Sequence, residues 1–484
     1  DDSSCSSSDH SKCKMGDLIR KHGQIIVGSN NNRYSKQFVI DTHLSLSILE
    51  SSREIYVVLY EKNRVFTCSK INPVTPKEVK ANFNMDGVKG SILFSQGYRT
   101  DPTVVTVNLE NLRGRGKWYH VHEFPVPQRQ TKDDELCSPQ SVGGHFNPFG
   151  VDPKIGPPAG IGTNDQYEIG DLSGKYGPLT EDQDLYNFLG IYVDMNLPLF
   201  GINSIVGRSV VIHKADGKRW ICANIGYPGK VITAAATFVF PIVGQVIFRQ
   251  GENSNLDETT VFVELSYSDG TTNNTENHAW HVHENEHGRD FYNWSKRCSS
   301  AGSHYNPSRV GLGRLYSTQC SSENPLRCEL GDLTSKSKRI SIAAYKNSVQ
   351  NKLFYTDIQL PLSGSHSIVG RSIVVHDDSA PKQRGNRLAC STIRYVHSIT
   401  AAVRSWKSGS GITSNVSGSM VFFQESESDE TDIKIDLHGL NKLASGYHVH
   451  KVISISNPFN EGLFKEAINI IDLIRKQFSL IIEI

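Results

Sequence analysis

Several histidines of the chain have a spacing that suits a metal site. His120 and His122 are two residues apart within a run of strand-forming residues, and His145 and His213 follow them. Alternate residues of a strand point to the same face, so His120 and His122 present two imidazoles side by side. A single pair of this kind is a weak signal, because a buried histidine more often has a structural role.

The same four histidines return in the same order about 160 residues later, as His281, His283, His304 and His376. Histidines with only structural roles would not recur in this way, so both sets are predicted to bind a metal ion. Four imidazoles without a thiolate suit tetragonal Cu(II), with Zn(II) as the competitor. The histidines that lack a repeated partner are interpreted as structural or surface residues: His278, His287, His366, His397 and His438.

Longer segments repeat with the same period, which is the size of a domain. Arg219 stands three residues before Cys222, and Arg387 stands three before Cys390. Three further pairs of segments match, namely Gly143–Pro148 with Gly302–Pro307, Glu168–Leu172 with Glu329–Leu333, and Ser204–His213 with Ser367–His376.

The elements that carry these residues are predicted to be strands. Val, Ile, Thr, Tyr and Phe recur in short runs broken by Gly, Asn, Asp and Ser, which is typical of an all-β protein. A chain of 484 residues is too long for one hydrophobic core. We therefore predict a partial repeat over 1–76, complete repeats over 77–229 and 230–397, and a partial repeat over 398–484. The tail 463–484 has helical period.

The repeat also predicts how the nine cysteines pair. Long-range bridges Cys137–Cys222 and Cys298–Cys390 would be equivalent, as would local bridges Cys320–Cys328 and Cys5–Cys13, with Cys68 left unpaired. Disulfides indicate an oxidising compartment, and acceptor sequons for glycans at Asn273, Asn293 and Asn415 are compatible with secretion. Nine reduced thiols remain the alternative.

Charge and hydropathy exclude several other classes of function. The chain has 51 basic and 50 acidic residues, which favours neither nucleic acid nor an acidic membrane as a partner. It contains no apolar run of 18 residues, so no membrane span is predicted. It begins without an apolar leader, which fits a processed protein or a fragment.

The repeated blocks His-Val-His-Glu, His-Phe/Tyr-Asn-Pro, Gly-Asp-Leu, Ile-Val-Gly-Arg-Ser and Arg-x-x-Cys resemble the copper/zinc superoxide dismutase family. The resemblance implies tandem domains, each an eight-stranded Greek-key β-barrel, with copper held by the four histidines of each set. It also implies that Arg219 and Arg387 lie beside the copper and receive superoxide.

The chain departs from the family at the zinc site. Pro153 and Leu312 stand where a zinc histidine is expected, Glu168 and Glu329 replace another, and only Asp171 and Asp332 remain. The segments from the last histidine to the repeated cysteine are also too short for the family's long charged loop. This pattern resembles the copper-only dismutases and their tandem-repeat relatives. We therefore expect about two coppers per chain and no zinc. Glu168 and Glu329 would hold His145 and His304, while Asp171 and Asp332 brace the loop.

The partial repeats lack complete sites. Tyr60 stands at the position of the last histidine, Val65 at that of the arginine and Lys14 at that of the glutamate, so 1–76 should bind no copper. In 398–484, His448 and His450 are followed by Lys451 and by no further ligand.

The favoured function is extracellular dismutation of superoxide. Two alternatives stay open: a secreted copper-binding or storage protein with little turnover, and a structural matrix protein. The sequence also leaves open whether the repeats pack together as a pseudo-dimer.

Overall fold

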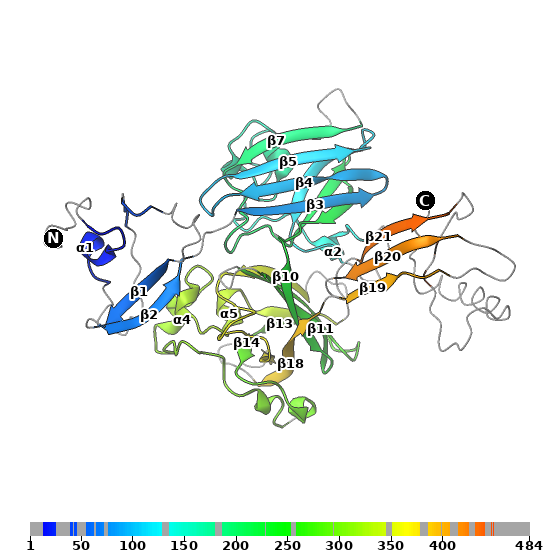
Figure 1. Cartoon of the computed structure of the whole chain (residues 1–484). Coiled ribbons are helices and arrows are strands. Elements are labelled where there is room, and N and C mark those ends of the chain that lie inside the picture. Colours follow the sequence, from blue (N-terminus) through cyan, green and yellow to red (C-terminus); the bar gives the residue numbers. More distant parts are fainter. Residues whose placement is uncertain are drawn as a thin grey trace. The chain divides into compact units, whose positions relative to one another are not determined.

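The structure is a computed structural model of the whole chain, in which most of the two complete repeats is described (Figure 1). It describes residues 13–25, 39–41, 43–45, 55–61, 64–71, 76–127, 135–179, 186–227, 229–252, 258–293, 295–344, 351–377, 386–397, 399–406, 415–424, 431–440, 447 and 449.

The chain divides into two compact units, 1–75 and 76–484. The first holds helix α1 (Leu18–His22) and the antiparallel strands β1 (Tyr56–Glu61) and β2 (Arg64–Lys70). The ammonium of Lys21 is fully buried and lies 3.1 Å from a carboxylate oxygen of Asp41. This small unit is thus stabilised by a buried ion pair as well as by its strands.

Seven strands build the repeat 77–229. They form one sheet in the order β3-β4-β5-β7 and a second in the order β6-β8-β9. Buried and exposed residues alternate along β3, as expected when one face of a sheet covers the core. The bounds are β3 (Lys77–Met85), β4 (Val88–Gln96), β5 (Thr103–Glu110), β6 (Gly116–His122), β7 (Phe188–Asp194), β8 (Ser209–Lys214) and β9 (Arg219–Asn224).

The repeat 230–397 has the same strands in one continuous sheet, β14-β17-β18-β10-β11-β12-β16, with a short pair β13-β15 beside it. Its last strand lies next to its first, as Ala235 opposite Arg394 shows. The bounds are β10 (Val231–Phe238), β11 (Ile242–Gly251), β12 (Thr259–Tyr267), β13 (Thr275–His278), β14 (Trp280–His283), β15 (Ile340–Ile342), β16 (Lys352–Asp357), β17 (Ser372–His376) and β18 (Arg387–Val396).

Each repeat encloses its own apolar core, one around Phe94, Val107 and Tyr119 and the other around Phe248, Val263 and Trp280. In 77–229 the bridge between Ala81 and Ile225 joins the first strand to the end of the last, as β10 and β18 do in the second repeat. The long returns between neighbouring strands are those of a Greek key. The predicted all-β, tandem-barrel fold class is confirmed.

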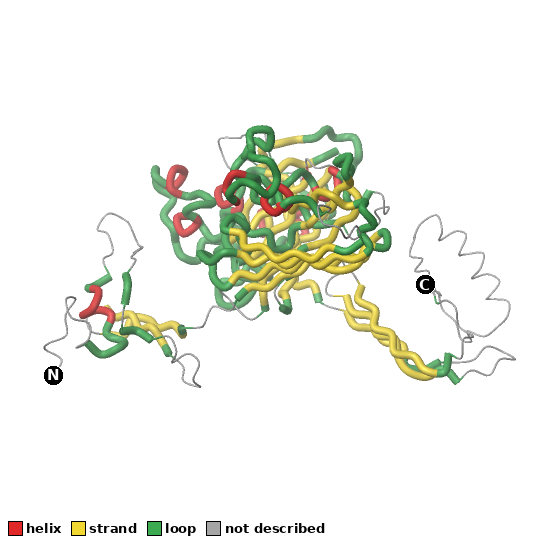
Figure 2. Tube along the Cα trace, turned by 90° about the horizontal axis from the view of Figure 1, so that it is seen from above, coloured by secondary structure: helices red, strands yellow, loops and turns green. Residues whose placement is uncertain are grey.

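Helices are short and lie in the connections between strands (Figure 2). No helix in the described part of the chain is long and apolar enough to cross a membrane. The α-helices of the second unit are α2 (Pro139–Val142), α3 (Leu172–Tyr176), α4 (Tyr316–Gln319) and α5 (Leu333–Lys336), and 3-10 turns cover Asn164–Gln166, Arg289–Tyr292, Ser299–Ala301 and Pro325–Arg327.

The segment after residue 397 contains a three-stranded sheet, β19 (Ile399–Val403), β20 (Ser417–Gln424) and β21 (Thr431–His438). The predicted helical tail 463–484 and the residues His448 and His450 lie outside the described residues.

Candidate metal centres

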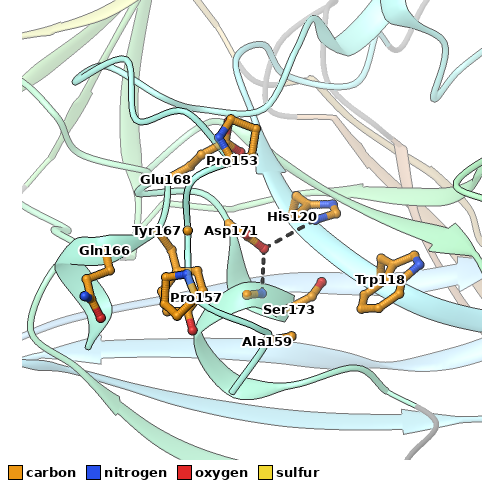
Figure 3. A pocket seen from close by; sticks show the side chains of 12 residues that line it. Trp118, His120, Pro153, Pro157, Ala159, Gln166, Tyr167, Glu168, Asp171 and Ser173 are labelled. Carbon is orange, nitrogen blue, oxygen red and sulfur yellow. Dashed lines mark hydrogen bonds and ion pairs between the residues drawn. The ribbon is translucent and has the colours of Figure 1, made fainter. Parts of the chain in front are cut away.

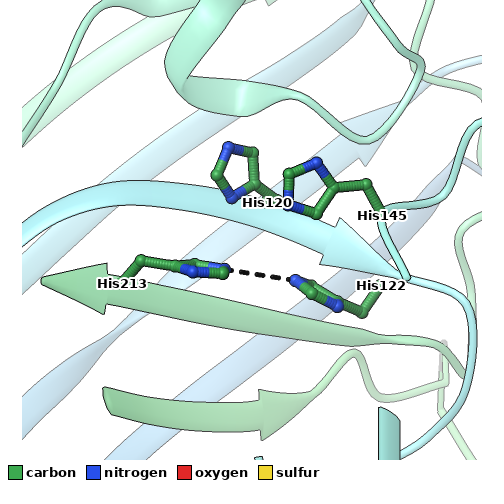
Figure 4. A group of neighbouring side chains, drawn as sticks. All are labelled: His120, His122, His145 and His213. Atoms are coloured by element: carbon green, nitrogen blue, oxygen red, sulfur yellow. Dashed lines mark hydrogen bonds between the residues drawn. The ribbon is translucent and has the colours of Figure 1, made fainter. Parts of the chain in front are cut away.

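Strands β6 and β8 bring the first histidine set together. They pair antiparallel with Trp118 opposite His213 and His122 opposite Ser209, and an isolated bridge links His122 to His145. The four rings of His120, His122, His145 and His213 therefore meet at one place (Figure 4), with one nitrogen of each within 4.8 Å of the others.

The second set is built in the same way. Strand β14 pairs with β17, and a bridge links His283 to His304. The nitrogens of His281, His283, His304 and His376 also lie within 4.8 Å of one another. These are the two groups of this kind in the part of the chain that the structure describes. The first is the more open, since the His145 side chain is 34% exposed and that of His304 only 7%.

Hydrogen bonds orient the rings so that one nitrogen of each faces the centre. His122 Nδ1 lies 3.2 Å from the carbonyl of Gly143, and His213 Nδ1 lies 3.0 Å from that of Gly217. Their Nε2 atoms then face each other at 3.3 Å. A neutral ring whose Nδ1–H donates to a carbonyl keeps Nε2 as a lone-pair donor for a metal.

Two of the central nitrogens are buried and have no hydrogen-bond partner among the described residues, His120 Nδ1 and His283 Nε2. An unsatisfied buried polar atom costs about 1–3 kcal/mol. A metal ion would satisfy these atoms, so the residues present fit the copper that the sequence predicts. His120 would then bind through Nδ1, whereas His122 and His213 would bind through Nε2.

Burial keeps these imidazoles neutral, which is the form that binds metal. It lowers the pKa of His122 to about 2 and that of His283 to about 3. Burial also lowers the pKa of His120 and His213, and the neighbouring histidines and the Arg219 guanidinium add to the effect.

Glu168 and Glu329 each lie beside the third histidine of their set. Glu168 Oε2 is 2.8 Å from His145 Nδ1, and Glu329 Oε2 is 3.0 Å from His304 Nδ1. Both carboxylates are buried, and Glu168 also accepts a hydrogen bond from the Asn147 amide. Each glutamate can therefore hold its histidine in the tautomer that leaves Nε2 toward the centre.

Replacing both glutamates should separate copper binding from turnover. In Glu168→Ala with Glu329→Ala, the four nitrogens of each site remain, so we expect most of the copper to be retained. Turnover should fall about tenfold or more, because the tautomer and orientation of His145 and His304 are no longer held. The loss should be larger at high pH, where protons for peroxide are scarce. Copper analysis and superoxide turnover across pH would measure both effects.

The matching glutamine variants keep the shape and remove the charge. If charge matters, Glu168→Gln with Glu329→Gln should resemble the alanine pair, whereas a purely steric role would leave the glutamine pair unaffected. An unchanged pH profile in both pairs would contradict the role assigned to these carboxylates.

The side chains of Asp171 and Asp332 make two kinds of contact, one of which sequence reasoning missed. Their side chains accept hydrogen bonds from Gly174 and Ser335 at the first turns of α3 and α5. Asp171 Oδ1 also lies 3.4 Å from His120 Nε2 (Figure 3), and Asp332 Oδ1 lies 3.7 Å from the corresponding nitrogen of His281. Each aspartate therefore faces the first histidine of its set.

The surroundings of the two aspartates differ. Asp171 borders a cavity of about 170 Å³, which Trp118, His120, Pro153 and Tyr167 also line (Figure 3). In the second repeat the Tyr316 hydroxyl donates to Asp332 at 2.6 Å. The histidine sets are thus alike, while the loops outside them are not.

A buried lysine lies in the short helix that follows each of these aspartates, at Lys175 and Lys336. Sequence reasoning also missed these two residues. Lys175 Nζ donates to the carbonyls of Ile169 and Asn196 and lies 2.9 Å from Asp194, with both charged side chains fully buried. Lys336 and Asp357 form the equivalent pair. The signal was available in the sequence, because a lysine follows each Gly-Asp-Leu aspartate by four residues.

Arg219 and Arg387 are held over the loop that precedes the third histidine. Arg219 donates to the carbonyls of Cys137 (3.1 Å) and Gly143 (2.7 Å), and Arg387 donates to those of Cys298 and Gly302. Gly143 and Gly302 are also the carbonyls that orient His122 and His283. Each arginine is partly exposed, so its charge can meet an anion near the histidines.

Disulfides tie these loops to the sheets. Cys137–Cys222, Cys298–Cys390 and Cys320–Cys328 are present, and Cys68 is free and exposed. Cys13 is disulfide-bonded, and its predicted partner Cys5 lies outside the described residues. Cys137 and Cys298 are also residues whose carbonyls accept hydrogen bonds from the arginines. The bridges Cys137–Cys222 and Cys298–Cys390 therefore join each of these residues to the strand that carries its arginine.

Known proteins match the chain in the same region. The family model of copper/zinc superoxide dismutase (SODC) matches twice, over residues 88–233 and 242–393, which is more than half of the chain.

Individual relatives cover about a quarter of the chain each. Cell surface superoxide dismutase (Cu-Zn) 4 of Candida albicans is 33% identical over 140 residues, 28% of this chain and 53% of that protein. Cell surface Cu-only superoxide dismutase 5 of the same organism is 35% identical over 140 residues, 28% of this chain and 54% of that protein. The chain thus spans about half the length of these two relatives.

Superoxide dismutase 5 of Dictyostelium discoideum is 32% identical over 131 residues, 27% of this chain and 74% of that protein. The solved Cu(II) structure of Candida albicans superoxide dismutase 5 aligns with a TM-score of 0.25 and 30% identity over 32% of this chain and 93% of that one. By its two family matches and its paired four-histidine sets, the chain belongs to the copper/zinc superoxide dismutase family.

Proposed function

We propose that 77–229 and 230–397 are two copper-only domains that dismutate superoxide to O2 and H2O2. The observation that carries this proposal is the repetition of four convergent imidazoles with a tethered arginine beside them. In this proposal the copper ligands are His120, His122, His145 and His213 in one domain and His281, His283, His304 and His376 in the other.

Bound copper would supply one-electron redox chemistry. The protein's part is to hold the four imidazoles, to keep an anion near them and to limit the protonation of the ligands. Arg219 and Arg387 attract superoxide by their charge. Glu168 and Glu329 hold the Nδ1 proton of His145 and His304, so these two rings keep one orientation through repeated turnover.

Metal analysis tests the proposal. We expect about two coppers per chain after full loading and no stoichiometric zinc, because the described residues of each complete repeat contain one four-histidine set and no second cluster of this kind. Inductively coupled plasma analysis with superoxide turnover normalised per copper gives both numbers. Four coppers per chain, or zinc equal to copper, would overturn the two-site, copper-only assignment. Copper without turnover would favour a storage or matrix protein instead.

The proposed location is extracellular. Two relatives are named as cell-surface proteins, and disulfides persist in oxidising compartments. The boundaries 1–76, 77–229, 230–397 and 398–484 remain our proposal for the domains, with copper bound in the middle two.

A further inference from the structure

The outward residues of strand β7 in the repeat 77–229, together with Val104 of β5, are apolar although they are exposed. Leu189, Ile191 and Val193 alternate along β7 and are 72%, 68% and 59% exposed, and Val104 on β5 is 39% exposed. In an antiparallel sheet with one solvated side, outward positions are normally polar. A contiguous exposed apolar patch of this kind marks an interaction surface. These four residues are called the β5–β7 face below.

The corresponding strands of the second repeat are β12 and β16. Thr103 pairs with Asp194 in the first repeat, as Thr259 pairs with Asp357 in the second. The aspartate of each pair forms the ion pair with the buried lysine described above. On this register Ile191 occupies the position of Phe354.

In the second repeat this face is covered by the first repeat. Phe354 is 7% exposed and lies under the guanidinium of Arg208, which is 4.7 Å from its ring. Its neighbour Phe262 packs 6.5 Å from the Phe124 ring. The Lys352 ammonium donates to the Gln140 carbonyl at 2.8 Å.

The surface of the first repeat that contacts this face is formed by Arg208, Phe146 and Tyr227. It is called the Arg208 platform below, and its counterpart in the second repeat is called the Arg371 platform. Arg208 donates to the carbonyls of Ser204 and Glu123 and stacks 3.7 Å from the Phe146 ring. Beside it, the Tyr227 hydroxyl lies 2.7 Å from that of Thr260 on β12.

The second repeat carries the same platform, and there it is open. Arg371 donates to the carbonyls of Ser367 and Glu284 and stacks 3.5 Å from the Tyr305 ring. Tyr395, at the position of Tyr227, is 44% exposed. A Cβ at Gly207 in the first platform would touch Phe354, whereas one at the equivalent Gly370 would meet nothing within 4 Å.

Among the described residues of 76–484 there is therefore one exposed apolar face and one exposed platform of the kind that covers such a face. We propose that the β5–β7 face of one chain docks on the Arg371 platform of a second copy, in the way that β12 and β16 dock on Arg208. Such a contact joins different surfaces, so it is heterologous and can extend head to tail. It needs no copper, and its outcome is independent of the dismutase assignment.

Sedimentation velocity of the full chain over a range of concentrations tests this. We expect the wild-type mass to rise with concentration and the association to weaken at least about tenfold in Ile191→Asp, which puts a charge into the apolar contact. Tyr395→Asp on the platform should have the same effect. Mixing the two variants should restore dimers but not longer assemblies, since each variant keeps one intact surface.

Ile155→Asp is the matched control, because Ile155 belongs to the same repeat and is 83% exposed but lies outside the face. It should associate like the wild type, and all three variants should keep the wild-type copper content. Only Ile191→Asp and Ile155→Asp should also keep the wild-type melting temperature, because Tyr395→Asp loses the hydrogen bond from the Tyr395 hydroxyl to the Leu362 carbonyl. A chain that stays monomeric at every concentration would overturn the proposal. So would Ile191→Asp with unchanged association, or a mixture that does not form dimers. If Ile191→Asp blocks association and Tyr395→Asp does not, the face pairs with another surface and the platform assignment is wrong.

Discussion

Replacing one central histidine in each complete repeat is expected to abolish superoxide turnover. In His213→Ala with His376→Ala, each site keeps three imidazoles and loses one that faces the centre. Even the loss of a group that only supports a metal ligand costs about 10–100-fold in affinity or activity. Loss of a ligand should therefore reduce turnover per chain by more than about 100-fold, with copper content measured on the same samples.

The single variants show whether both sites act. Each of His213→Ala and His376→Ala should lose the activity of one site and one copper, and the two residual rates should sum to that of the wild type. His438→Ala is the control, because this side chain is 74% exposed and belongs to neither set. Full activity in the double variant would mean that these histidines do not carry the reaction.

Reversing the charge of both arginines is expected to give the second largest effect. Fields that steer a charged substrate raise association rates by about 10–10³-fold. In Arg219→Glu with Arg387→Glu the rate with superoxide should therefore fall at least about tenfold, while the eight histidines and the copper content stay unchanged. The difference from wild type should shrink as ionic strength rises, since salt screens exposed charges.

Two further variants separate charge from loop position. Lys218→Glu makes the same change of charge at a neighbouring side chain that is 79% exposed. It should lower the rate with superoxide much less than the arginine substitutions do. Arg219→Lys with Arg387→Lys keeps the charge but not the paired contacts to the Cys137 and Gly143 carbonyls or their equivalents. The rate of this variant with superoxide should lie between that of the wild type and that of Arg219→Glu with Arg387→Glu. Equal rates for all variants would show that the arginines have a structural role only.

Sequence alone determined the features that depend on local periodicity and on internal repetition. The spacing of His120 and His122 follows from the two-residue period of a strand, and the second copy predicts which later histidines join them. The same comparison predicts the Cys137–Cys222 and Cys298–Cys390 bridges. It also singled out Glu168 and Glu329, because each replaces a residue type that the family's zinc site needs.

Only the tertiary structure decided features that depend on long-range contacts. The choice of Nδ1 for His120 and Nε2 for His122 depends on Asp171 and on the Gly143 carbonyl, which come from other parts of the chain. The partner of buried Lys175 is likewise an aspartate from another strand. Strand alternation places Ile191 and Phe354 equally on outward faces, yet one is 68% exposed and the other is covered. That difference arises because residues brought together by folding, not by sequence, supply the packing surface.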